Sequence, residues 1–99
     1  MLDLAPSYRQ QVLDLVHQHA PQAAIYAFGS RTQGVAKPFS DLDLLLDPPL
    51  PMSWAQRASL RMAFEESDLP MRVDWQLWQD APEHLRAAAR EANVALTPV

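Results

Sequence analysis

Cysteine is absent from the 99 residues, and glycine occurs only twice. Without cysteine the chain has no disulfide framework and no thiolate metal site, the usual marks of small secreted scaffolds. No apolar run approaches the roughly 18 residues that a membrane-spanning helix needs, and no apolar signal segment stands at the N-terminus. We therefore expect a cytoplasmic protein that makes no membrane contact.

Positive charge is also scarce. The formal net charge is −4, from 12 acidic and 8 basic residues, and the basic residues form no cluster. Direct binding of nucleic acid is not expected, because such surfaces carry clustered Lys and Arg. The length predicts one small domain, residues 1–99, and a domain of this size buries only about 60 to 70% of its unfolded surface. Part of its stability can therefore come from a partner.

Both glycines, Gly29 and Gly34, lie in one stretch, FGSRTQGVAKPFSDLDLLLD at residues 28–47. Glycine allows a positive φ or the close approach of a ligand to the backbone. The apolar residues 23–28 predict a buried strand, and residues 31–33 predict a helical turn. A strand, a Gly-Ser turn and a helical turn would direct backbone N–H groups and the Ser30 hydroxyl to one place, which favours phosphate binding.

Two aspartates, Asp41 and Asp43, alternate with leucines in the segment DLDLLL at residues 41–46. In a strand the two carboxylates share one face, about 6.7 Å apart, while the leucines pack on the other. At an effective dielectric of ~20 the pair repels by roughly 2 to 3 kcal/mol. A hard divalent cation such as Mg²⁺ would relieve this repulsion. The alternative is the solvated face of an edge strand, but the neighbouring Gly-Ser turn favours a metal site.

The helices are predicted from apolar spacing and capping residues. The first is expected over residues 7–20, with Ser7 and Gln10 as a capping box. The second follows the stiff connection PPLP at residues 48–51, begins at a capping box of Ser53 and Gln56, and ends near residue 67. Its expected apolar positions include Trp54, Ala58, Met62 and Phe64.

Residues 71–78 alternate between apolar and polar and predict a third strand, with Asp74 on its polar face. A last helix is expected to begin at a capping box over residues 80–83 and to end near residue 92. Residues 93–99 either add an edge strand or lie outside the sheet. The predicted fold class is α/β, a small mixed β-sheet with helices packed on one face and the carboxylates on the other, open face.

The motif Gly29-Ser30, ten intervening residues and Asp41-Leu42-Asp43 resembles the signature of the DNA polymerase β-like nucleotidyltransferases. The short chain and the run SDLDL at residues 40–44 are similar to the minimal (MNT) branch of that superfamily. The resemblance implies transfer of a nucleoside monophosphate from a nucleoside triphosphate to an acceptor hydroxyl, with two metal ions and three carboxylates. Many minimal members are antitoxins of the MntA type, paired with a HEPN-domain ribonuclease toxin, and some add AMP to a tyrosine of that toxin.

The resemblance assigns roles to residues that match the motif. Asp41 and Asp43 would be catalytic carboxylates and metal ligands, and Asp74 matches the third carboxylate, which the family takes from a later strand beside the pair. These three would hold two Mg²⁺ ions, with ATP as the substrate. The phosphates would be bound by Gly29, Ser30 and Arg31, although Arg31 and Lys37 have an equally plain interpretation as surface charges.

The function that follows from the resemblance is AMP transfer from ATP to a hydroxyl, that of a tyrosine, on a partner HEPN toxin. The protein would thereby act as an antitoxin. The alternative is a binding module that neutralises the toxin by direct contact, without turnover. An exposed tryptophan among Trp54, Trp75 and Trp78 would favour an interface, whereas a buried one belongs to the core.

Overall fold

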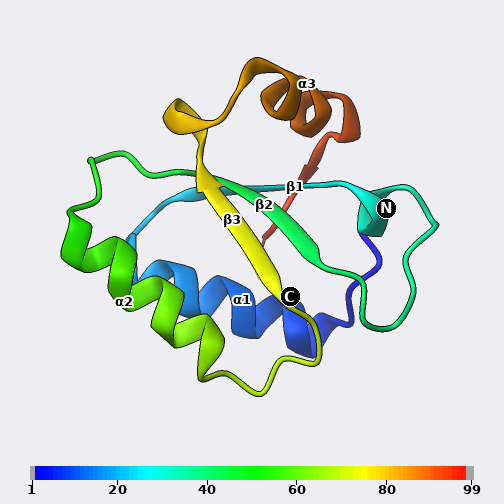
Figure 1. The fold of residues 1–99 in the computed structure, drawn as a ribbon, viewed down its shortest axis with the longest axis horizontal. Helices are drawn as coiled ribbons and strands as arrows, with labels where there is room; N and C mark the ends of the chain where they lie inside the picture. The colour runs from blue at the N-terminus through cyan, green and yellow to red at the C-terminus, as the bar shows by residue number, and fades with distance from the viewer. Residues whose placement is uncertain (1, 98–99) are drawn as a thin grey trace.

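A four-stranded sheet forms the centre of the computed structural model, which describes residues 2–97 (Figure 1). Its spatial order is β3-β2-β1-β4, where the strands are β1 (Ala24–Phe28), β2 (Leu42–Asp47), β3 (Val73–Leu77) and β4 (Val94–Ala95). β1 pairs antiparallel with β2 and with β4, whereas β2 and β3 are parallel. The α/β class and the mixed sheet are confirmed, and the tail does add an edge strand; residues 98 and 99 lie outside the described residues.

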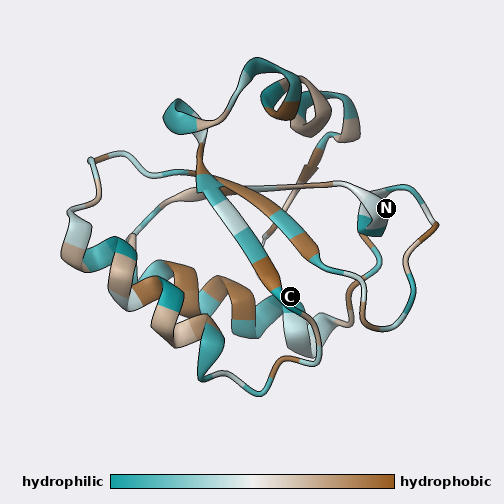
Figure 2. Cartoon of the chain, in the orientation of Figure 1, coloured by the Kyte–Doolittle hydropathy of each residue, from teal (hydrophilic) through white to brown (hydrophobic). Residues whose placement is uncertain are grey.

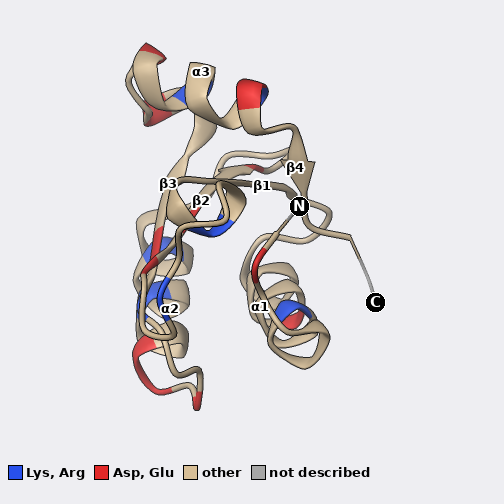
Figure 3. Ribbon diagram, turned by 90° about the vertical axis from the view of Figure 1, so that its right-hand side faces the viewer, with Lys and Arg blue, Asp and Glu red and all other residues tan. Residues whose placement is uncertain are grey.

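Three helices cover the sheet on both sides. α1 (Pro6–His19) and α2 (Trp54–Glu65) lie on one side, and α3 (Glu83–Ala92) lies on the other, as the side view in Figure 3 shows. The expectation that all helices pack on one face is therefore wrong for α3. The cause is that Tyr26, Phe28 and Leu45 make part of the second face apolar, and Leu85 and Ala89 of α3 pack against it.

The main hydrophobic core lies between the sheet and the pair α1 and α2. Alternate strand residues face it, and Leu42, Leu44 and Leu46 of β2 are fully buried there, as the predicted alternation requires. Figure 2 shows hydrophobic stretches on β2 and α1, two of the elements that supply this core. The polar positions of β2 and β3 consequently face the opposite side, beside α3.

The helix starts differ from two of the three predicted capping boxes. α1 has no side-chain cap and begins at Pro6. Proline suits the first helical position, because the N–H group that it lacks would have no partner within the helix there. α3 has Pro82 at its N-cap, while Asp80 pairs with Arg57 at 3.2 Å instead. The box of Ser53 and Gln56 is confirmed, with both reciprocal hydrogen bonds present.

The apolar positions expected to bury α2 are partly wrong. Leu60 is the buried residue of this helix, whereas the side chains of Trp54 and Met62 are 82% and 56% exposed. Leu50, in the preceding connection, is also exposed. α2 therefore presents an apolar surface that the sheet does not cover.

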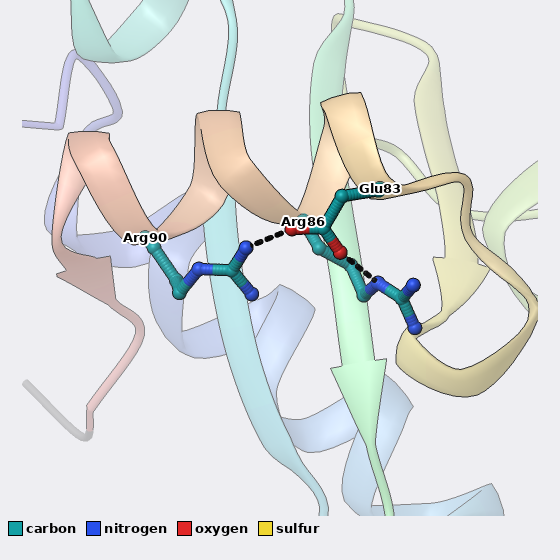
Figure 4. A network of polar contacts seen from close by, with 3 residues as sticks. All are labelled: Glu83, Arg86 and Arg90. Carbon is teal, nitrogen blue, oxygen red and sulfur yellow. Dashed lines mark hydrogen bonds and ion pairs between the residues drawn. The ribbon is translucent and has the colours of Figure 1, made fainter.

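The charged residues of α3 lie on its surface, outside the core. Glu83, in its first turn, forms ion pairs with Arg86 at 3.1 Å and with Arg90 (Figure 4). The hydrogen bond from Arg90 lowers the pKa of the Glu83 carboxyl. Such exposed pairs contribute little to stability.

Of the helices within residues 2–97, none combines the length and the apolar character that crossing a bilayer would require.

Candidate active site

Gly29 marks the end of β1 and the beginning of the site. Its φ is +83°, a conformation that side chains rarely adopt, and a Cβ placed on it would stand 2.5 Å from Oδ2 of Asp43. The carboxylate of Asp43 therefore lies directly against the backbone of residue 29. The predicted close approach at this glycine is present, and the group that approaches is a carboxylate of the same chain.

Asp43 and Asp74 occupy neighbouring strands in register. The pairing of β2 with β3 places Asp43 opposite Asp74, and the pairing of β1 with β2 places Phe28 opposite Asp43. Adjacent strands lie about 4.8 Å apart. Because both aspartates alternate with core residues, their side chains project from the face opposite the main core. The structure thus brings Asp74 beside Asp43, as the sequence predicted.

The surroundings of Asp43 disfavour its charged form. Burial raises the pKa of the Asp43 carboxyl, and the negative charges of Asp74 and Asp41 raise it further, while the positive charge of Arg72 opposes them. All four side chains therefore act on one small region. A carboxyl group whose pKa is shifted by burial and by neighbouring charges is typical of active sites.

Asp41 lies one residue before β2, so the strand begins later than the sequence predicted. Its carboxylate is 3.5 Å from the guanidinium of Arg72, and both side chains are largely exposed. Sequence reasoning missed Arg72, although a signal was present: Arg72 precedes Asp74 by two residues and so belongs to the same face of an extended segment.

The donor set fits hard divalent cations in chemistry, since it consists of three carboxylates. Within residues 2–97, however, no three acidic, histidine or cysteine side chains are already placed as a metal-binding group. Asp41 is engaged with Arg72, and Asp43 lies against Gly29. Binding of an ion by all three carboxylates therefore requires Asp41 to exchange Arg72 for the ion. Burial is the first cause of the raised pKa of Asp43, and the negative charges of Asp74 and Asp41, which a cation would neutralise, add to it.

Ser30 and Arg31 follow Gly29 in a short 3₁₀ turn, η1 (Ser30–Thr32), close to the predicted turn at residues 31–33. Arg31 does not lie among the carboxylates. Its side chain is buried, and it donates hydrogen bonds to the carbonyl oxygens of three other residues, Asp3, Pro38 and Ser40. The expectation that Arg31 binds phosphate is therefore corrected, because its guanidinium is already occupied by backbone. Lys37 remains an exposed residue whose amide donates to Ser40 Oγ.

Comparison with known protein families identifies the family to which this chain belongs. The family described as "Polymerase beta, Nucleotidyltransferase" matches residues 10–97. The chain belongs to this family. The matched region includes the Gly-Ser turn, all three aspartates and every strand of the sheet, so the family suggested by the motif is confirmed.

Individual relatives agree with this assignment. This chain is 38% identical over 95 residues to "Probable protein adenylyltransferase MntA" of Haemophilus influenzae (strain ATCC 51907 / DSM 11121 / KW20 / Rd). The alignment covers 96% of this chain and 83% of that protein. A crystal structure described as a toxin-antitoxin with AMP-PNP matches with a TM-score of 0.74 and 23% identity, over 92% of this chain and 73% of the other. A structure of a tri-AMPylated Shewanella oneidensis HEPN toxin in complex with MNT antitoxin matches with a TM-score of 0.67 and 17% identity, over 96% and 74%. The two structures support the fold.

The nucleotidyltransferase also has a groove beside its carboxylates. The groove has a volume of about 630 Å³ and extends between the C-terminal half of α2 and the start of β3. Arg61, Phe64 and Trp75 line it, and Asp74 lies at its border. Volumes of this size are common for ligand sites. A second molecule can therefore approach Asp74 from the free edge of the sheet.

Proposed function

We propose that this protein transfers AMP from ATP to a hydroxyl of a partner HEPN toxin, that of a tyrosine, and so acts as its antitoxin. The observation that carries the proposal is the in-register pair of Asp43 and Asp74 beside the Gly29 turn, in a chain 38% identical to a relative named as a protein adenylyltransferase. The names of the similar structures, which pair an MNT antitoxin with a HEPN toxin, support the choice of partner. Because ATP is the proposed donor, we place the reaction in the cytoplasm.

Asp41, Asp43 and Asp74 are the residues proposed to hold two Mg²⁺ ions. Bound there, the ions would neutralise the triphosphate and stabilise the charge that develops at the α-phosphorus. Asp43 is the central ligand of the three, since it lies between Asp74 on β3 and the Gly29 turn. Arg72 would release Asp41 and remain beside the phosphates, whose charge replaces that of the carboxylate.

The transfer itself needs an acceptor, a base and a place for the leaving group. The acceptor hydroxyl oxygen attacks the α-phosphorus, the bond from this phosphorus to the β-phosphate oxygen breaks, and pyrophosphate leaves. Asp74 accepts the hydroxyl proton, because it is exposed at the border of the groove through which the acceptor would enter. Ser30 and the backbone of Gly29 bind the β- and γ-phosphates, next to Asp43.

The test is transfer of label from ATP labelled at the α-phosphate, in Mg²⁺, to the purified protein encoded by the neighbouring gene. The wild type is expected to label the toxin, and Asp43→Asn is expected to lose at least about 100-fold in rate, since a metal ligand is removed. Asp47→Asn is the matched control, because Asp47 lies at the other end of β2, about 13 Å away at the usual rise per residue. Equal labelling by both variants would contradict the assignment of Asp43.

One observation favours the alternative of a binding module. Trp54, the first residue of α2, is 82% exposed, and Leu50, in the connection before this helix, is 76% exposed. Exposed tryptophans are common at protein interfaces. The alternative predicts that Asp43→Asn still neutralises the toxin and that Trp54→Ala does not. If the protein acts by AMP transfer, Asp43→Asn is expected to lose the ability to neutralise the toxin.

A further inference from the structure

Arg31 is the one charged or polar residue that is buried within residues 2–97, with 5% of its surface exposed. Its guanidinium donates from Nε to the Ser40 carbonyl at 3.0 Å, from Nη1 to the Asp3 carbonyl at 2.7 Å and from Nη2 to the Pro38 carbonyl at 2.9 Å. All three acceptors are main-chain oxygens. These hydrogen bonds therefore fix the path of the backbone and do not orient another side chain.

The three acceptors come from segments that border the site. Pro38 and Ser40 belong to the connection of residues 33–41, which leads from η1 to β2 and ends at Asp41. Asp3 belongs to the segment before α1, and its amide in turn donates to the carbonyl of Arg31 at 2.7 Å. One residue of the Gly29 turn thus joins the N-terminal segment to the connection that carries Asp41.

The connection is also held at its two ends, where the Gln33 amide donates to the Ser30 carbonyl and Asp41 pairs with Arg72 at 3.5 Å. Arg31 reaches the residues between those ends. Most of its residues are exposed, including Val35 at 66% and Phe39 at 77%. The bonds between Lys37 and Ser40 are internal to the connection, so they shape it without attaching it to the sheet. Conversely, the guanidinium is satisfied only by this arrangement, since a buried cation without acceptors is costly.

We infer that Arg31 is a positioning residue that keeps Asp41 beside Asp43 by fastening residues 33–41 to the Gly29 turn and to the N-terminal segment. The inference rests on the proposed function for the role of Asp41, but the fastening itself is a property of the unliganded protein. Lysine cannot replace arginine here, because a single ammonium cannot reproduce the planar fork that reaches three separated carbonyls. Removing such a support typically weakens metal binding by about 10- to 100-fold.

The test compares Arg31→Lys with the control Arg57→Lys. Arg57 also donates to a main-chain carbonyl, that of Met52, and to an aspartate, Asp80, but it lies on α2 away from the carboxylates. Two quantities are measured on each folded variant: hydrogen exchange at the amides of Asp3 and Ser40 without ligands, and the dissociation constant for Mn²⁺ as a probe ion. Arg31→Lys is expected to accelerate both exchange rates and to weaken Mn²⁺ binding by about 10-fold or more, and Arg57→Lys to change neither.

A folded Arg31→Lys variant with wild-type exchange at both amides would overturn the inference. Wild-type Mn²⁺ affinity in a variant with accelerated exchange would overturn it too, because the connection would then be loose without consequence for Asp41. If the wild type itself binds no Mn²⁺, the proposed function fails, and exchange alone decides the fastening by Arg31. Should Arg31→Lys not fold, deletion of residues 1–3 removes one acceptor, and a smaller acceleration at Ser40 supports the inference, whereas unchanged exchange overturns it.

Discussion

Asp43 is the residue at which stability and function conflict most directly. Its carboxylate is partly buried against the backbone of Gly29, and it is repelled by Asp74 across the strand pair and by Asp41. Arg72 compensates only in part, because its ion pair is formed with Asp41. A folded chain that retains such repulsion gives up stability at this position, which is common where a site must bind a cation.

The first prediction concerns pH and Asp43. Because folding raises the pKa of this carboxyl above its ordinary value of 3.8, the folded state binds more protons than the unfolded state between those two values. Stability therefore falls as pH rises through this window. Asp43→Asn removes this loss, so the variant is expected to melt higher than the wild type at neutral pH and to converge with it in acid. The check is a series of melting curves from about pH 3 to about pH 7, with Asp47→Asn as the control.

Two outcomes of the melting experiments would contradict this prediction. If Asp43→Asn melts below the wild type at neutral pH, the carboxylate is stabilised by its surroundings and the repulsion described here is absent. If Asp47→Asn shows the same gain, the effect comes from the overall negative charge and not from the position of Asp43.

The second prediction uses both glycines of the chain. Gly29 and Gly34 have similar positive φ values, +83° and +73°, so an alanine at either is expected to lose roughly 1 to 2 kcal/mol of stability. They differ in their surroundings, since a Cβ at residue 29 meets Asp43 at 2.5 Å and a Cβ at residue 34 meets nothing within 4 Å. We expect Gly29→Ala to displace Asp43 and abolish AMP transfer, and Gly34→Ala to retain it. Denaturant unfolding and the labelling assay measure the two effects, and equal activity in the two variants would refute the contact.

At the scale of elements, β1 could be predicted from its short apolar run, and β2 and β3 from the alternation of apolar and polar residues, because one face of each strand lies against the main core. DLDLLL and the residues around Asp74 showed which side chains share a face, and the register then brought Asp43 and Asp74 together. Alternation does not say which face a following helix will cover. The placement of α3 depends on Leu45 and Phe28 needing cover beside the carboxylates, a requirement that exists only once the strands are paired.

Helix starts show the same limit. Ser53 caps α2 as predicted because its partner Gln56 is local and nothing competes with it. At α3 the predicted Asp80 cap is lost because Arg57, 23 residues earlier in the chain, pairs with that carboxylate. Local patterns thus predict local contacts, and contacts between distant segments override them.

The third prediction belongs to α2. Ser53→Ala removes the hydrogen bond from the Gln56 amide to the serine hydroxyl, and a lost N-cap typically costs about 1 kcal/mol. Ser53 lies at the N-terminal end of the helix, opposite the end that lines the groove beside Asp74, so AMP transfer below the unfolding transition is expected to be unchanged. Chemical denaturation measures the loss, and Ser59→Ala, at an exposed position within the same helix, is the control for removing a hydroxyl. A loss of transfer in folded Ser53→Ala would show that α2 and the site are coupled.

At the scale of the whole molecule, the residues whose roles were not predicted are those whose partners are brought together by folding rather than by sequence spacing. Arg31 was interpreted as a ligand of phosphate because it follows the Gly-Ser turn, yet its contacts with Asp3 and Ser40 exist only in the folded chain. Arg72 was overlooked because its ion pair joins segments 31 residues apart in sequence. Asp41 and Asp43, in contrast, were proposed from their spacing and strand alternation, and Asp74 from its position on the polar face of a later strand together with the family resemblance.

The fourth prediction concerns ligand binding by the whole domain. At about 100 times the dissociation constant, Mg²⁺ and ATP should stabilise the folded state by about 2.7 kcal/mol, which for a domain of this size raises the melting temperature by roughly 10 to 20 °C. Asp43→Asn is expected to gain little from the same ligands, because the central ligand of the proposed metal site is missing. The two proteins should therefore exchange order: without ligands the variant melts higher at neutral pH, and with saturating Mg²⁺ and ATP the wild type does. If neither Mg²⁺ nor ATP changes the melting temperature of the wild type, the acidic face is not their binding site, because a ligand that binds only the folded state must stabilise it.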